Sequence, residues 1–237
     1  DAAVAVAAAM TVLEPTTNGI GGDAFVLGIF GGEVVGLNAS GRSPARQPRS
    51  AFDGRAAMSM RGWGPVTVPG AVSGWVALWK RFGRLPFADL LEPAIRFARD
   101  GFLVAPRTAE LWARAYPSMS QMPEWKRVFA PNGRAPFAAE RIVFADHART
   151  LESIALSEGA SFYTGELAKA IADAALARAL DIHPSVGLDV EQLKQQARAT
   201  AAPSSPPAVV ATVAEVLDRL AEGDRYVSLV AFMIDEI

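Results

Sequence analysis

The pattern of hydrophobic positions changes from helical to strand-like near the start of the chain. Residues 1–13 carry alanine or valine at almost every position, which predicts a buried helix rather than an amphipathic one. Two short apolar runs follow at residues 24–30 and 33–37, separated by Gly31 and Gly32. Such runs around a two-residue glycine turn predict a β-hairpin. Because both strands hold few polar residues, we expect the sheet to be covered on both faces.

Helical spacing returns in the middle of the chain and continues through most of the remainder. Helices are predicted at residues 71–82, 86–100, 106–116, 145–158, 165–180 and 208–220. We also expect a strand-like VTVPG segment at 66–70 and a proline-broken surface loop at 117–136. Trp75 and Trp79 are one turn apart and could line a ligand, but helical aromatic side chains usually face a core. We therefore expect core packing for this pair.

Composition places the chain among globular proteins and argues against several classes of partner. Its 237 residues are 51% hydrophobic and 20% charged, which is enough to bury a sizeable core. We predict one domain over residues 1–237, with residues 181–207 as a linker or divergent segment. The net charge of −2 provides no basic field for nucleic acid. No uninterrupted apolar run of about 18 residues occurs, so no membrane-spanning helix is expected.

The scarcity of cysteine and histidine limits the chemistry available on this chain. There are no cysteines, which excludes disulfides, thiolate catalysis and cysteine-bound zinc. His147 and His183 are isolated from each other, so a Ser-His-Asp triad or a multi-histidine metal site is poorly supplied. Asp146 before His147 resembles an oriented base, but the pair opens a predicted helix and has no obvious nucleophile. We therefore expect N-cap and surface roles for it, and neither a metal nor a cofactor.

The first helix is joined to the hairpin by a glycine-rich loop with the sequence EPTTNGIGGDAF. Gly19, Gly21 and Ala24 formally fit the dinucleotide fingerprint GxGxxA, which needs a strand before it and a helix after it. Here the predicted order is reversed, and no Gly-Lys-Ser/Thr follows, as a P-loop would require. We therefore predict that this loop turns the chain close to the core and does not bind a nucleotide.

A polar loop after the hairpin carries three closely spaced arginines, Arg42, Arg46 and Arg49. A guanidinium group offers a two-pronged donor that matches a carboxylate, so the loop could hold an acidic substrate. The alternative is an ordinary solvated basic loop, and composition alone favours that alternative.

Three ordered blocks of the sequence carry a family resemblance. They read DAAVAVAAAMTVLEPTTNGIGGDAF, VPGAVSGWVALWKRFGRLPFADLLEPAIRFARDGF and SFYTGELAKAI. Together they resemble the large subunit of γ-glutamyltransferases, also called γ-glutamyltranspeptidases. Two later stretches, SSPPAVVATVAEVLDRL and GDRYV, resemble segments near the end of that subunit, although the connection between the blocks is shorter than in the family.

The resemblance implies an α+β fold, the four-layer αββα arrangement of N-terminal-nucleophile hydrolases. It also implies a precursor that cuts itself, with the new N-terminal threonine of the small subunit as nucleophile and its own α-amino group as base. Such an enzyme forms a γ-glutamyl ester and passes the acyl group to water or an amino acid, while backbone N–H groups stabilise the oxyanion. No cofactor takes part.

This chain departs from the family pattern in two respects. It has no candidate for the nucleophile, because Thr16 and Thr17 belong to the glycine loop. It is therefore expected to be a large subunit whose threonine-bearing partner is separate, or else an inactive scaffold subunit. The family's carboxylate-binding arginine falls at Ser40, whereas Arg42 in SGRSP resembles the transferase-like and acylase-like branch. We predict that Arg42 binds the substrate carboxylate and that Ser40 adds a weaker polar contact, for a γ-glutamyl or related acyl group.

Overall fold

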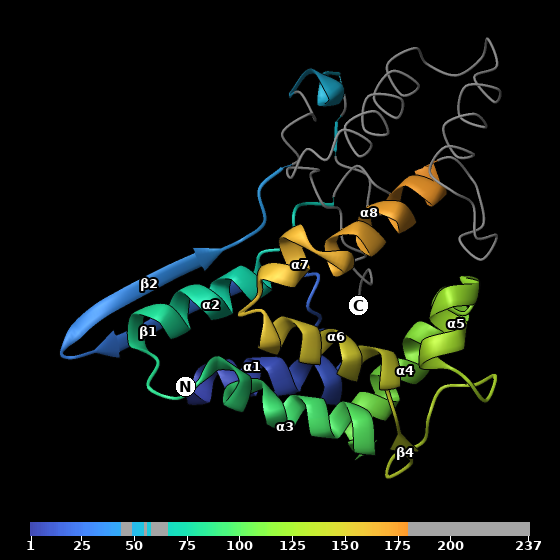
Figure 1. The fold of residues 1–237 in the computed structure, drawn as a ribbon. Coiled ribbons are helices and arrows are strands. Elements are labelled where there is room, and N and C mark those ends of the chain that lie inside the picture. Colours follow the sequence, from blue (N-terminus) through green and yellow to red (C-terminus); the bar gives the residue numbers. More distant parts are fainter. Residues whose placement is uncertain (44–48, 55, 58–65, 180–237) are drawn as a thin grey trace. The chain divides into compact units, whose positions relative to one another are not determined.

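The computed structural model describes residues 1–43, 49–54, 56–57 and 66–179 (Figure 1). Predictions about the linker at 181–207, the helix at 208–220 and His183 lie outside this range. Within it the chain divides into two compact units, which are described separately here. Unit 1 contains Asp1–Ser40 and Gly70–Ser161, and unit 2 contains Gly41–Pro69 and the described residues from Phe162 onward. The prediction of one domain over the whole chain stays a prediction.

The first helix of unit 1, α1 (Ala2–Leu13), lies where the hydrophobic pattern predicts it. Val4, Ala8 and Val12 recur every four residues and are buried on the side that packs against α3 (Phe87–Asp100). Val6, on another side, is 61% exposed. The predicted helix is therefore confirmed. The expectation that all sides of this helix are buried is wrong for the described chain, whose residues cover only part of the helix surface.

A two-stranded antiparallel hairpin follows the glycine loop, as predicted. It pairs β1 (Ala24–Phe30) with β2 (Glu33–Ala39). Gly31 and Gly32 both have positive φ angles, 61° and 86°, which two-residue hairpin turns require. The inner face packs on α2 (Ala71–Phe82), where Phe30 stacks on Phe82 with ring centroids 4.1 Å apart.

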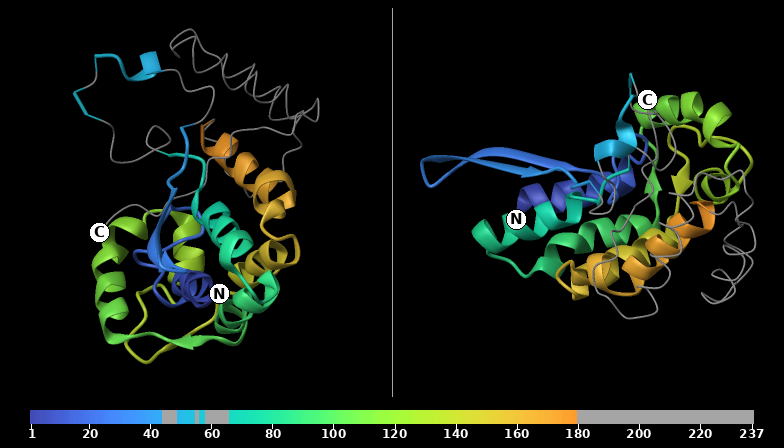
Figure 2. Two further views of the ribbon diagram at one scale, coloured as in Figure 1. Left: turned by 90° about the vertical axis from the view of Figure 1, so that its left-hand side faces the viewer. Right: turned by 90° about the horizontal axis from the view of Figure 1, so that it is seen from above.

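The other face of the hairpin is apolar and uncovered. Its large side chains are exposed by 69 to 82%: Phe25, Leu27, Ile29 and Val34. We call these four residues the outer hairpin face. Successive strand residues point to opposite sides, so α2 can cover one face only. The expectation that both faces are covered is wrong for the described chain. The right-hand view of Figure 2 shows the hairpin reaching beyond the helices of unit 1.

The core of unit 1 forms where α3 packs against both α1 and α6 (Ala145–Leu156). Leu91 of α3 and Leu151 of α6 are completely buried there. As predicted, α3 ends at Asp100, and Gly101 follows as its C-cap with a φ of 88°, which suits a glycine. Trp75 also lies in the core at 4% exposure, which confirms the expected packing for that residue. Trp79 is only half-buried, with its ring tilted against Phe87 at a centroid distance of 5.1 Å.

The stretch predicted as a proline-broken loop is partly helical. Helix α4 (Pro106–Met119) continues through Pro117, and Pro123 begins a further helix, α5 (Pro123–Phe129). Proline is well tolerated at the first position of a helix, because its missing N–H has no helical partner there. Two short strands, β3 (Phe102–Leu103) and β4 (Arg141–Ile142), pair antiparallel beside these helices.

Unit 2 contains the loop after the hairpin and the end of the described chain. It includes the 3₁₀ turn η1 (Arg49–Phe52) and the helix α8 (Glu166–Ala179), which agrees with the helix predicted at 165–180. A short helix, α7 (Ala160–Thr164), precedes α8. The strand predicted at 66–70 is wrong, because this segment has no regular secondary structure. Within the described ranges, no helix is both long and apolar enough to cross a bilayer.

Candidate functional site

The two predicted substrate-binding residues lie at the junction between β2 and the following loop. Ser40 is exposed, and its backbone N–H donates to Asn38 Oδ1 at 2.9 Å. Arg42 is also exposed, and among the described residues no carboxylate pairs with its guanidinium group. Arg46 and the side chain of Arg49 lie outside the described atoms. Arg42 is therefore the arginine of this loop that the structure presents as available to an anion.

The base of this loop is closed by the segment before α2. The Val68 N–H donates to the Arg42 carbonyl oxygen at 2.9 Å. Gly41 packs so closely on this segment that a Cβ atom there would lie 1.9 Å from the Val68 oxygen and 2.4 Å from Thr67 Oγ1. A side chain at residue 41 would push the two segments apart, so only glycine allows this close contact beside Arg42. We call the contacting residues, Gly41–Arg42 and Thr67–Val68, the Arg42 stem.

The glycine loop is fixed to the N-terminus of α2. The Gly22 carbonyl accepts hydrogen bonds from the N–H groups of Gly70 and Ala71, at 3.0 and 2.9 Å. These amides are among those that an anion would use at a helix N-terminus, and here they already have a partner. The observed order of α1, loop and β1 also matches the order that argued against a dinucleotide site.

Sequence reasoning missed a hydrogen-bond network around Glu14. Its carboxylate accepts hydrogen bonds from the hydroxyl groups of Thr16 and Thr17, and from Asn18 Nδ2 at 2.6 Å. Short polar side chains two to four residues after a glutamate were the available signal. The network stiffens the entry to the glycine loop, which supports the structural role predicted for that loop.

His147 is half-buried rather than exposed, which contradicts the surface role expected for it. Burial lowers its pKa from 6.5 to about 4. Its Nε2 lies 3.3 Å from Thr11 Oγ1, whose own hydroxyl donates to the Ala8 carbonyl at 2.7 Å. Nε2 is therefore the donor in this contact, and His147 is no base for the Thr11 hydroxyl.

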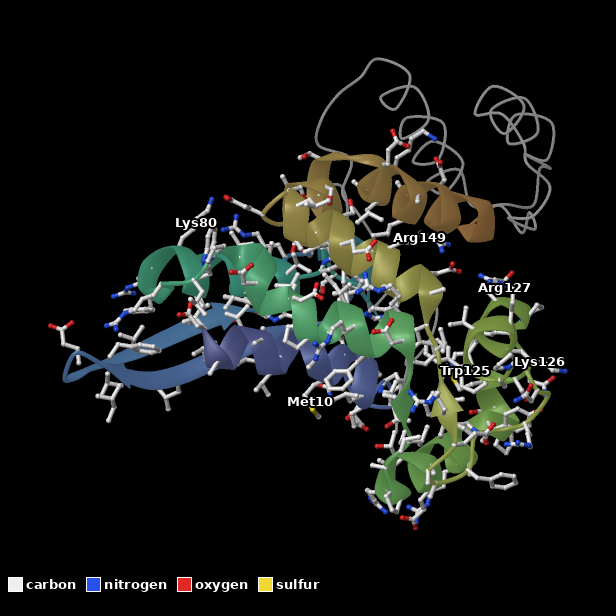
Figure 3. All side chains as sticks on the ribbon, turned by 60° about the horizontal axis from the view of Figure 1, so that its bottom comes forward. Met10, Lys80, Trp125, Lys126, Arg127 and Arg149 are labelled. Carbon is white, nitrogen blue, oxygen red and sulfur yellow. The ribbon has the colours of Figure 1, made fainter. Side chains whose placement is uncertain are left out.

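Asp146 has the surface role predicted for it but not the N-cap role, because Phe144 occupies the N-cap of α6. It forms ion pairs with Arg149 and with Arg127, whose Nη1 lies 3.5 Å from Asp146 Oδ2 (Figure 3). No group of three or more metal-binding side chains occurs in the part of the chain that the structure describes.

Comparison with known proteins gives two kinds of match. The family model described as gamma-glutamyltranspeptidase matches residues 1–179. Over 175 residues the chain is 38% identical to the glutathione hydrolase-like YwrD proenzyme of Bacillus subtilis, covering 72% of this chain and 33% of that protein. The crystal structure of cephalosporin acylase from Bacillus halodurans is similar with a TM-score of 0.68 and 42% identity, covering 81% of this chain and 36% of that one.

The second kind of match covers fewer residues at a higher sequence identity. Over 67 residues the chain is 97% identical to the probable inorganic carbon transporter subunit DabA 1 of Bradyrhizobium sp. (strain BTAi1), covering 28% of this chain. The chain spans 8% of that transporter subunit and 33% of the glutathione hydrolase-like relative. The C-terminal stretches that resemble the end of a large subunit, SSPPAVVATVAEVLDRL and GDRYV, fall after the family match ends.

Proposed function

The chain belongs to the gamma-glutamyltranspeptidase family, and we propose that it acts as the large subunit of an amidohydrolase from the acylase-like branch. The observation that carries this proposal is the exposed Arg42 guanidinium, which lies on a closed stem and has no described carboxylate partner. A charged donor held at a fixed position can orient an acyl donor through its free carboxylate.

In the proposed reaction, the nucleophile is a threonine on a small subunit made from the same precursor. Its hydroxyl attacks the amide carbonyl of the donor, its α-amino group takes the hydroxyl proton, and the amine leaves with a proton. The resulting acyl ester is then cleaved by water or by an amino acid, which regenerates the threonine. Arg42 binds the distal carboxylate throughout, and the Ser40 hydroxyl adds a weaker polar contact. In this proposal the described chain binds the substrate, and the small subunit supplies the nucleophile and the base.

The uncovered apolar surfaces of unit 1 support a missing partner. The outer hairpin face exposes four large side chains, and Val6 of α1 is also exposed. Exposed apolar patches of this kind mark interaction sites. We assign the outer hairpin face to the sheet of the small subunit, which would complete the four-layer αββα arrangement.

The proposed acyl donors are amides whose acyl group ends in a carboxylate. The names of two relatives, a glutathione hydrolase-like proenzyme and a cephalosporin acylase, point to γ-glutamyl and related acyl groups. Arg42 lies two residues after the position expected for a γ-glutamyltransferase. A dicarboxylic amide such as a glutaryl amide therefore fits the proposal as well as a γ-glutamyl amide does.

The experiment that tests this function is to express the complete gene product and examine it by mass spectrometry for a second chain that begins with threonine. The purified protein is then assayed with a γ-glutamyl anilide and a glutaryl anilide. We expect the threonine-initiated chain and hydrolysis of at least one donor. Absence of both would overturn the enzyme proposal.

A second candidate is a subunit without catalytic activity that serves as an interaction scaffold. The observation in its favour is the 97% identity, over 67 residues, to part of a probable transporter subunit. A chain that joins a family fold to such a segment could act through association rather than through catalysis. The same mass spectrometry separates the two candidates, because a scaffold needs no threonine-initiated chain.

A further inference from the structure

The stem that holds Arg42 depends on the dipeptide Val68–Pro69, which precedes α2. Val68 binds the Arg42 carbonyl through its N–H, and Gly41 packs directly against the Val68 oxygen. Pro69 follows at once and is buried. Because proline fixes its own φ and restricts the residue before it, this dipeptide is stiff. A contact that fixes Pro69 therefore also fixes the Val68 N–H.

Such a contact comes from α7, which lies 94 residues later in the chain. The Tyr163 hydroxyl donates a hydrogen bond to the Pro69 carbonyl oxygen at 2.9 Å. The Tyr163 ring meets the buried Phe162 ring edge-on, with centroids 5.2 Å apart, which restricts the direction in which the hydroxyl points. Tyr163, Pro69, Val68 and Arg42 all belong to unit 2.

We propose that Tyr163 is a positioning residue for substrate binding, acting on Arg42 through Pro69 and Val68. This inference rests on the proposed function, in which Arg42 binds the carboxylate of the acyl donor. The Tyr163 hydroxyl donates a hydrogen bond to the Pro69 carbonyl, and the adjoining Val68 N–H donates one to the Arg42 carbonyl. Together these bonds fix the backbone of Arg42 and so limit the positions that its guanidinium group can take. Loss of the hydroxyl loosens the stem without removing any group that contacts substrate.

The test compares Tyr163→Phe with Tyr116→Phe, a matched control. Tyr116 also donates its hydroxyl to a backbone carbonyl, that of Gly133, but it belongs to unit 1, whereas the Arg42 stem belongs to unit 2. The first measurement is amide hydrogen exchange at Val68 by NMR, in the full chain. A net hydrogen bond is worth about 1 kcal/mol, so Tyr163→Phe should speed Val68 exchange by about fivefold. Tyr116→Phe should leave it unchanged.

The second measurement is steady-state kinetics of the processed enzyme with a carboxylate-bearing donor. Tyr163→Phe should raise KM by about fivefold and leave kcat near the wild-type value, because only orientation of the binding group changes. In an Arg42→Ala background the same substitution should add nothing, since no guanidinium group remains to be positioned. A purely structural role would instead lower the amount of active protein in both backgrounds.

The outcomes separate this inference from the proposed function. If Arg42→Ala leaves KM unchanged, the proposed role of Arg42 fails. If Arg42→Ala raises KM but Tyr163→Phe changes neither Val68 exchange nor KM, the positioning role is overturned while the proposed function survives. Should Tyr163→Phe fail to fold, Gly41→Ala disturbs the same stem from its other side. That variant must raise both Val68 exchange and KM, or the inference is overturned.

Discussion

At the scale of single residues, Arg42 differs from most other arginines of the described chain in having no carboxylate near it. Arg99, Arg107, Arg114, Arg127, Arg134 and Arg149 all form ion pairs. Exposed ion pairs contribute little to stability, so these contacts mainly fix where the side chains lie. The structure leaves Arg42 without such a contact, which suits a residue that meets a substrate anion.

Replacement of Arg42 tests its role directly. We expect Arg42→Ala to raise KM for a carboxylate-bearing donor by tenfold or more, because a hydrogen bond to a charged group is worth about 1.5–3 kcal/mol. Arg42→Lys keeps the charge but loses the planar fork, so its KM should lie between the KM of the wild type and that of Arg42→Ala. An uncharged donor of the same length serves as control, and its KM should respond to neither variant. Equal effects on both donors would contradict carboxylate binding.

His147 makes the stability of the fold depend on pH. The pKa of His147 is about 4 in the folded chain, against an ordinary value of 6.5 that applies to the unfolded chain. As the pH falls, the unfolded chain therefore binds a proton at a higher pH than the folded chain does. Stability is therefore fully present above about pH 6.5 and is lost as the pH falls toward about 4. The loss attributable to this group is about 3 kcal/mol.

The comparison of wild type with His147→Gln, by urea unfolding at several pH values, checks this expectation. Gln keeps a side-chain donor for Thr11 Oγ1 but does not titrate. Between pH 6.5 and 4 the free energy of unfolding should fall more steeply for wild type than for the variant. Parallel curves would mean that His147 is accessible to protons in the folded state.

At the scale of elements, the hairpin has one face that its own chain covers and one that it does not. We expect the double variant Leu27→Lys and Ile29→Lys to change the free energy of unfolding of the chain by less than about 0.5 kcal/mol per site, because both side chains are already exposed. The same variant should prevent the threonine-bearing chain from copurifying. Val35→Lys, on the buried inner face, should instead destabilise unit 1. Normal copurification of the double variant would rule out this docking face.

Helices were the most predictable elements, and the reason is visible in their spacing. Helix α2 begins and ends at the predicted residues, since its apolar positions repeat at helical intervals and Gly83 follows it. Helix α5 was missed because Pro123 was taken as a breaker, although it stands at the first helical position. Strands β3 and β4 have two residues each, too few to show any alternation.

The site was predictable only in part. Arg42 and Ser40 were proposed from a motif, which places residues along the chain but not in space. The hydrogen bond from Tyr163 to Pro69 joins residues 94 apart, and no local pattern reports such a contact. The outer hairpin face shows a related limit. Alternation reveals which side chains share a face but not whether the chain's own residues cover it.

At the scale of the whole molecule, the chain carries two matches of different character. The family match ends at residue 179, and the 97% identical match is 67 residues long, nine more than the 58 residues that follow in a chain of 237. Placed at the end of the chain, this match begins at residue 171, inside α8. On that placement, the two parts of the molecule join within one helix.

The described part of α8 continues across residue 171 without interruption. Ala168 and Ala172 are four residues apart, share one face and are both buried. Lys169 Nζ lies 2.8 Å from Asp173 Oδ2, and this hydrogen bond raises the pKa of Lys169. The buried face and the ion pair each take one residue from either side of residue 171.

We accordingly expect both parts to occur in one polypeptide in the cell. Cleavage after glutamate should release residues 167–191 as one peptide, because Glu166 and Glu191 flank this stretch and no glutamate lies between them. Mass spectrometry of protein from the source organism can detect that peptide, and the same digest of recombinant chain supplies the reference spectrum. Its detection would establish the joined chain. Peptides from either side found only in two separate proteins would show instead that the scaffold candidate has no physical basis, and that the transporter-like segment belongs to another chain.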